Sequence, residues 1–132
     1  MANRMTAIGA YRPRLKLNRS VGADELAKYI SRGTALNRGE IRNVLTELHD
    51  AIVYFNSQGT PVHIEDVGYF TPSIRLTGNL NVNLRLDPAI RHKINLPGIF
   101  SGEILNGDNI GLAQEDLIAI WNAANPEDPV EA

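Results

Sequence analysis

The residues best suited to a chemical role are basic side chains, and their spacing suits phosphate binding better than catalysis. Residues 1–20 hold five Lys or Arg and no acid, whereas the rest of the chain has 8 basic and 15 acidic residues. Over residues 11–17, apolar and basic positions alternate, so Arg12, Arg14 and Lys16 would share one face of a strand. This ridge could follow an anionic partner. Equally, it could be the charged face that protects an edge strand, or a solvated tail without a partner.

No group of side chains has the spacing of a catalytic or metal-binding site. His49, His63 and His92 lie apart, and none stands at metal-ligand spacing with another ligand. Glu65 and Asp66 are neighbours on an expected strand, so their carboxylates would point to opposite faces and could not act together. The absence of cysteine excludes disulfides and thiolate chemistry. The sequence therefore predicts no enzyme, metal, cofactor or small-molecule substrate.

Composition and hydropathy predict a soluble domain. Apolar residues make up 43% of the 132 residues, which is the usual share for such a domain. No window approaches the roughly 18 apolar residues of a membrane span, and residues 1–20 contain no signal-peptide run. We therefore expect a cytoplasmic protein without a membrane partner.

Two helices separated by a short turn are predicted in the first half of the chain. The first spans residues 22–31. The second, residues 37–57, has one continuous apolar stripe at three- and four-residue spacing. Asn37 can accept hydrogen bonds from the free N–H groups of its first turn, and Gly59 followed by Pro61 ends it.

A three-stranded antiparallel sheet is expected to follow the second helix. The first strand would run up to Val67, and Gly68 would allow the sharp reversal into the second strand, residues 69–76. After a turn at residues 77–79, apolar and polar residues alternate cleanly over residues 80–86. The two helices can cover one face of this sheet.

The two ends of the chain carry weaker signals. Residues 1–10 have no periodicity and are expected to be disordered. Pro88 suits the first position of a helical turn after the third strand. Residues 95–111 are predicted to be mostly irregular, and a last helix is predicted over residues 113–124. The acidic, proline-containing end that follows is expected to fray.

The succession of a short helix, a long helix and a glycine-turn hairpin resembles the amino-terminal half of the HU/IHF family of dimeric, histone-like DNA-binding proteins. The likeness covers about residues 22–86 and is strongest over residues 34–70. Residues 66–70, Asp-Val-Gly-Tyr-Phe, are similar to the family's Gly-x-Gly-x-Phe hairpin, with aspartate where the first glycine usually stands. The basic leading strand and the tail around Trp121 and Pro126 look like the divergent HU-like proteins of Bacteroidetes-type bacteria.

The resemblance implies an α+β, HU/IHF-like fold in which two N-terminal helices pack on a three-stranded antiparallel sheet, with a C-terminal helix, in a dimer. A small core fits this, because pairing with a second copy would complete it. The implied parts are a basic N-terminal segment with an edge strand at residues 1–20, an HU-like domain at residues 21–97, and a C-terminal extension with one helix at residues 98–132.

The implied function is weak DNA binding without sequence preference, in the nucleoid. The turn at residues 77–79 would be all that remains of the family's long DNA-embracing arm, so DNA kinking in the family's manner is not expected. The sequence leaves open an alternative: a structural or protein-interaction module that keeps the dimer fold and does not bind DNA. The expected DNA contacts are Arg12, Arg14, Lys16, Arg19, Arg75, Arg85, Arg91 and Lys93. The expected dimer core is Leu45, Leu48, Ile52, Phe55 and Phe70.

Overall fold

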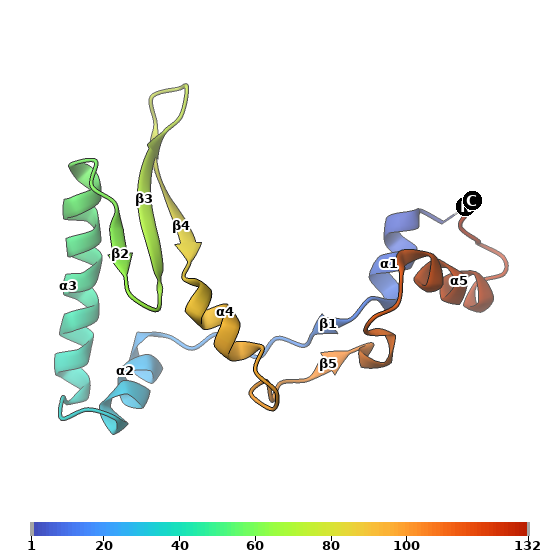
Figure 1. The fold of residues 1–132 in the computed structure, drawn as a ribbon, viewed down its shortest axis with the longest axis horizontal. Helices are drawn as coiled ribbons and strands as arrows, with labels where there is room; N and C mark the ends of the chain where they lie inside the picture. Colours follow the sequence, from blue (N-terminus) through green and yellow to red (C-terminus); the bar gives the residue numbers. More distant parts are fainter. Residues whose placement is uncertain (1, 132) are drawn as a thin grey trace. The chain divides into compact units, whose positions relative to one another are not determined.

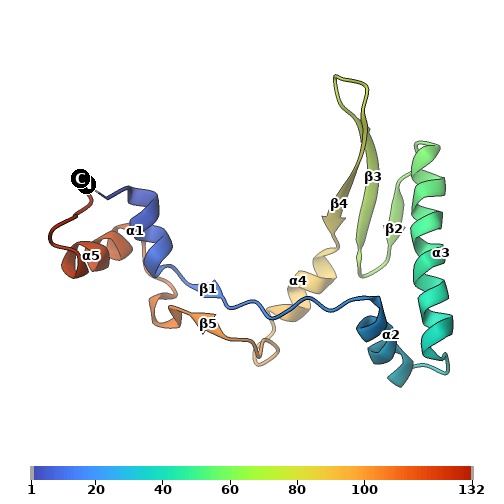
Figure 2. The ribbon, with the colours of Figure 1, turned by 180° about the vertical axis from the view of Figure 1, so that it is seen from behind.

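The computed structural model describes residues 2–131, which fold as two units of mixed α and β structure (Figures 1 and 2). The α+β class predicted from the sequence is confirmed. The terminal unit joins the N-terminal segment as far as Asn18 to the C-terminal segment from Ser101 onward, and the central unit spans Arg19–Phe100. Among the helices of residues 2–131, none is long and apolar enough to cross a membrane.

The terminal unit pairs the two ends of the chain. Its elements are α1 (Arg4–Tyr11), β1 (Arg14–Leu15), β5 (Ile104–Leu105), the 3-10 helix η1 (Gly107–Asn109) and α5 (Gln114–Ala124). Helix α1 packs against α5, and β1 pairs antiparallel with β5. The prediction that residues 1–10 are disordered is therefore wrong. The Asn3 side chain caps α1 by accepting from the Met5 N–H, and Ala7 is completely buried.

The predicted strand over residues 11–17 is also wrong for most of its length. Tyr11 belongs to α1, and only Arg14 and Leu15 pair with another strand. Because β5 has only two residues, it offers no sheet face on which an alternating pattern could be buried. Leu15 and Leu17 are accordingly exposed, although the alternation had placed them inside.

The acidic C-terminal end is ordered rather than frayed. The indole N–H of Trp121 donates to the carbonyl of Asp128, and the Asn122 side chain forms two hydrogen bonds with the backbone of Val130. These bonds fold the tail back along α5. The Val130 side chain is buried as a result.

The central unit contains the helices and the sheet expected from the sequence. Its elements are α2 (Ala23–Arg32), α3 (Arg38–Ser57), β2 (Val62–Ile64), β3 (Gly68–Ile74), β4 (Leu80–Leu86) and α4 (Pro88–Ile94). The strands form an antiparallel sheet in the order β2-β3-β4. Helix α3 packs on β2 and β3, and α2 packs on α3 (Figure 1).

Both ends of α3 follow from local sequence. The Asn37 side chain accepts a hydrogen bond from the Glu40 N–H at 2.8 Å, which satisfies a free donor of the first turn. At the other end, Gly59 has a φ of +78°. Its N–H donates to Asn56, and the next N–H, from Thr60, donates to Phe55. This is a Schellman termination, which favours glycine because of the left-handed backbone.

The turn between β2 and β3 assigns the roles of Asp66 and Gly68 differently from the sequence prediction. The reversal takes place over residues 65–67, and Asp66 has the left-handed φ of +64°. A short polar side chain tolerates this conformation, so aspartate can replace the glycine of the HU/IHF motif. Gly68 is already in β3, where a Cβ would lie 2.8 Å from the carbonyl oxygen of Arg85. Gly68 is therefore needed for the close approach of β4, not for the reversal.

The core of the central unit is thin. Among its described residues, the buried apolar side chains are Ala27 and Ile41. Leu48 and Phe55 on α3 and Leu84 on β4 remain exposed. One copy of the central unit therefore leaves much of its apolar surface in contact with water.

Candidate nucleic-acid interface

The eight basic residues expected to contact DNA are all exposed, but the structure does not bring them into one patch. Arg12, Arg14 and Lys16 belong to the terminal unit. Arg19, Arg75, Arg85, Arg91 and Lys93 belong to the central unit.

Two of the eight side chains have acidic partners. Lys16 lies 3.5 Å from Glu103, and Arg19 lies 3.3 Å from Glu25. Such exposed pairs contribute about 0–1 kcal/mol, so a phosphate could replace the carboxylate at little cost. The other six have no salt bridge to a carboxylate within residues 2–131. Their positive charges are free to meet an anion.

The β3–β4 hairpin carries a basic residue near each end. Arg75 begins the terminal turn: it accepts from the Gly78 N–H and donates to the Asn79 carbonyl. Arg85 lies near the base, opposite Tyr69. Five residues of β4 separate its first residue from Arg85, a distance of about 17 Å at the usual rise per residue. The two arginines are therefore separate contact points.

One face of the hairpin between these arginines is polar and carries no charge. Ser73 and Asn81 are paired across the strands, as are Thr71 and Asn83. The Asn81 side chain donates to that of Asn83, and Asn83 donates to the Ser73 hydroxyl. Amides and hydroxyls can contact phosphates and base edges without repelling a polyanion.

The base of the sheet carries a stack of side chains that the sequence prediction missed. The rings of His63 and Tyr69 are parallel, with centroids 4.0 Å apart, and the Arg85 guanidinium carbon lies 4.6 Å from the centroid of the Tyr69 ring. His63 Nε2 is also 3.1 Å from Asp87 Oδ2. The register explains the stack, because His63, Tyr69 and Arg85 are direct neighbours across three strands. Composition and spacing along the chain carry no signal for this register.

Asp87 joins this stack to the start of α4. Its side chain accepts a hydrogen bond from the Ala89 N–H and is 14% exposed. This backbone bond, followed by the bond to His63, holds the pKa of the Asp87 carboxyl below its usual value. Pro88 follows at the first helical position, as predicted, since its missing N–H costs nothing there.

Acidification from about pH 5 to about pH 3 is expected to destabilise the protein partly through Asp87. A carboxyl with a lowered folded pKa stabilises the fold above its unfolded pKa, about 3.9, and the contribution disappears as pH falls through the folded pKa. Asp87→Asn keeps a capping oxygen without the charge, so its melting temperature should fall less over this range. Glu47→Gln, at an exposed site on α3, is the control that should follow the wild type. Equal falls for wild type and Asp87→Asn would contradict this role.

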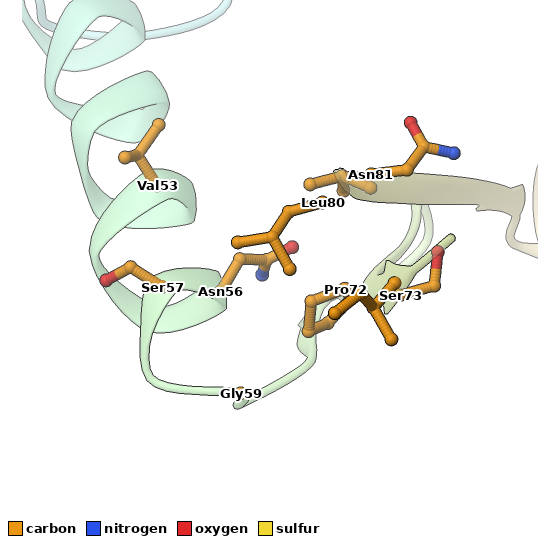
Figure 3. A pocket seen from close by; sticks show the side chains of 10 residues that line it. Val53, Asn56, Ser57, Gly59, Pro72, Ser73, Leu80 and Asn81 are labelled. Atoms are coloured by element: carbon orange, nitrogen blue, oxygen red, sulfur yellow. The ribbon is translucent and has the colours of Figure 1, made fainter. Parts of the chain in front are cut away.

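An apolar groove of about 600 Å³ lies between the end of α3 and the β3–β4 hairpin (Figure 3). Val53, Pro72 and Leu80 are among the residues that line it. Asn56, 8% exposed, also lines it and donates to the carbonyls of Thr60 and Phe70. Its Oδ1 is buried and accepts no hydrogen bond from any described residue. Buried polar atoms are nearly always paired, so this one indicates a missing donor.

The expected dimer-core residues lie around this incomplete surface. Leu45 and Ile52 on α3 and Phe70 on β3 are half-buried in one copy, whereas Leu48 and Phe55 are exposed. Within residues 2–131, no group of three or more His, Asp or Glu side chains is placed to hold a metal ion.

Comparison with known proteins places this arrangement in a family. No curated protein matches the chain. A family model described as an HU domain fused to a wHTH, Ig or glycine-rich motif matches residues 6–94. The matched stretch covers more than half of the chain and runs from within α1 to the end of α4. The chain therefore belongs to the HU-HIG family of HU-domain proteins.

Proposed function

We propose that the protein is a homodimeric, non-enzymatic DNA-binding protein of the nucleoid, in the cytoplasm, that holds duplex DNA weakly and without sequence preference. The observation that carries this proposal is the HU-like central unit, on which Arg75 and Arg85 are exposed and free of salt bridges to described carboxylates. Contacts between such arginines and phosphates position a protein on DNA but do not read its sequence.

Weak binding follows from the charge of the chain. The formal net charge is −2, so the protein as a whole does not attract a polyanion. Binding must therefore rely on local basic points such as Arg75, Arg85 and the basic residues of α4. A few phosphate contacts provide only modest, salt-sensitive affinity.

Pairing of two copies is supported by the incomplete core of the central unit. The exposed apolar residues of α3 and the groove beside it form one uncovered surface. A second copy would cover this surface through a two-fold contact, and a donor from it would satisfy Asn56 Oδ1. A two-fold dimer would also present two sets of basic residues to one duplex, which raises the overall affinity.

Affinity for a random-sequence duplex should fall steeply as salt is added. With about four phosphate contacts, the log–log slope of the binding constant against salt concentration should be near −3.6. Replacing Arg75 and Arg85 together by alanine should flatten the slope by about 1.8, because two contacts are lost. Fluorescence anisotropy with a labelled duplex measures both values.

The matched control removes two other exposed arginines of the central unit, Arg32 and Arg38, and should leave the slope unchanged. A wild-type protein with no duplex affinity at low salt, even at high protein concentration, would contradict DNA binding. That result would favour the alternative, a protein-interaction module that keeps the HU-like fold.

A further inference from the structure

Three side chains from three neighbouring strands form one continuous stack at the base of the sheet, which we call the Tyr69 stack. Tyr69, on the central strand β3, has His63 on one side and Arg85 on the other. The two rings are parallel to within 1°. The aromatic ring of Tyr69 is thus enclosed between an imidazole and a guanidinium.

The stack is fixed at its histidine end. His63 Nε2 is within hydrogen-bond distance of Asp87 Oδ2, and Asp87 is held in turn by the Ala89 N–H and by its own N–H, which donates to Val67. A chain of contacts therefore runs from the start of α4 through His63 and Tyr69 to Arg85. Only the arginine end faces a position without a described acidic partner.

The chemistry of guanidinium makes this end useful. All five N–H donors of arginine lie in the plane of the group, so a ring that packs against the flat face leaves every donor available. Contact with the face of a tyrosine ring also restricts a side chain that otherwise has many rotamers. Arg85 is consequently ordered before any ligand arrives, while its hydrogen-bonding edge stays exposed.

We infer that Tyr69 is a positioning residue for a DNA phosphate contact made by Arg85, and that His63 holds Tyr69 in place. The inference rests on the proposed DNA binding and adds residues to it that carry no positive charge of their own in the contact. An arginine ordered in advance loses less conformational freedom on binding, so the same contact gives higher affinity.

Tyr69→Leu should weaken duplex binding about threefold, the size expected for one side chain that loses its pre-organisation. The salt slope should stay that of the wild type, because Arg85 still reaches the phosphate. Arg85→Ala should instead flatten the slope by about 0.9, and the double variant should bind no more weakly than Arg85→Ala alone. Tyr69→Phe keeps the ring and should retain wild-type affinity.

The matched control is Tyr29→Leu, which removes an exposed tyrosine from α2 and should change neither affinity nor slope. Each variant is compared at equal folded fraction, from its melting curve. If Tyr69→Leu does not fold, His63→Ala decides in its place, because it removes the support of Tyr69 without altering β3.

Several outcomes would overturn the inference. An unchanged affinity for Tyr69→Leu would show that the ring only packs on the sheet, and so would an equal loss from this substitution in the Arg85→Ala background. Both results leave the proposed DNA binding intact. Absence of duplex binding by the wild type would overturn the proposed function and this inference together.

Discussion

Leu48→Asp should abolish the dimer and leave the central unit largely unfolded. Leu48 lies on α3 and is 37% exposed in a single copy, although it follows the apolar stripe of that helix. In a dimer that covers this stripe, aspartate would place an unpaired carboxylate in an apolar interface. The loss of stability should be on the order of 3–5 kcal/mol, the size measured when a buried charge lacks its partner.

Sedimentation equilibrium at micromolar concentration, together with far-UV circular dichroism, measures both effects. Asn43→Asp is the control, since it adds the same charge at an exposed position of the same helix. It should remain dimeric and lose no more than about 0.5 kcal/mol, because its new neighbour in charge, Glu47, is one turn away. A wild-type protein that sediments as a well-folded monomer would contradict the dimer.

The size of the expected effect reflects how little one copy buries. Small domains bury a modest fraction of their surface and are only marginally stable. In the central unit, Ile41 is buried, but Leu48, Phe55 and Leu84 are exposed. A single polar substitution at the interface would therefore remove a large share of the total stability.

Elements defined by neighbouring residues could be predicted from the sequence. Helix α3 has a regular apolar stripe, a capping Asn37 and a terminating Gly59, and all three signals lie within the helix or next to it. Strand β4 alternates cleanly, and Pro88 suits a helix start. Each of these features is decided by local conformational preference, so a single sequence contains the information.

The terminal unit could not be predicted, because distant partners order it. The Asn106 side chain donates to the carbonyls of Ala10 and Arg12, and the Asn109 side chain donates to that of Tyr11. These bonds join residues 94 to 98 positions apart in the chain. Nothing in the spacing of residues 1–10 indicates such contacts.

The candidate site was predicted in the same uneven way. The exposure of Arg75 and Arg85 follows from charge alone. The contact of Arg85 with Tyr69 depends on strand register, which pairing over the whole sheet decides. Gly68 was recognised as special, but its reason, the closeness of a carbonyl on β4, is visible only in three dimensions.

Ala7→Asp should unfold the terminal unit. Ala7 is 0% exposed on α1, the helix that packs against α5, so a carboxylate there would be buried without a partner. The expected cost is several kcal/mol, roughly 3–5, which a unit of about 50 residues with few buried apolar side chains cannot absorb. Removal of residues 2–10 should have the same effect, because it removes α1 entirely.

The single tryptophan of the chain makes this prediction specific to one unit. Trp121 lies on α5, meets the Tyr11 ring edge-on at 6.4 Å, and donates to Asp128. Its emission should shift to longer wavelength in Ala7→Asp, since loss of these contacts exposes the indole to water.

Ala10→Asp is the control, because it makes the same chemical change at an exposed position of α1. It should cost no more than about 1 kcal/mol, the size of an unfavourable charge near a helix C-terminus, and should keep the emission of the wild type. If Ala7→Asp retains a wild-type emission maximum and melting curve, α1 does not pack on α5. The two ends of the chain would then not form one unit, and the basic residues at positions 12, 14 and 16 would again lie on a tail without structural support.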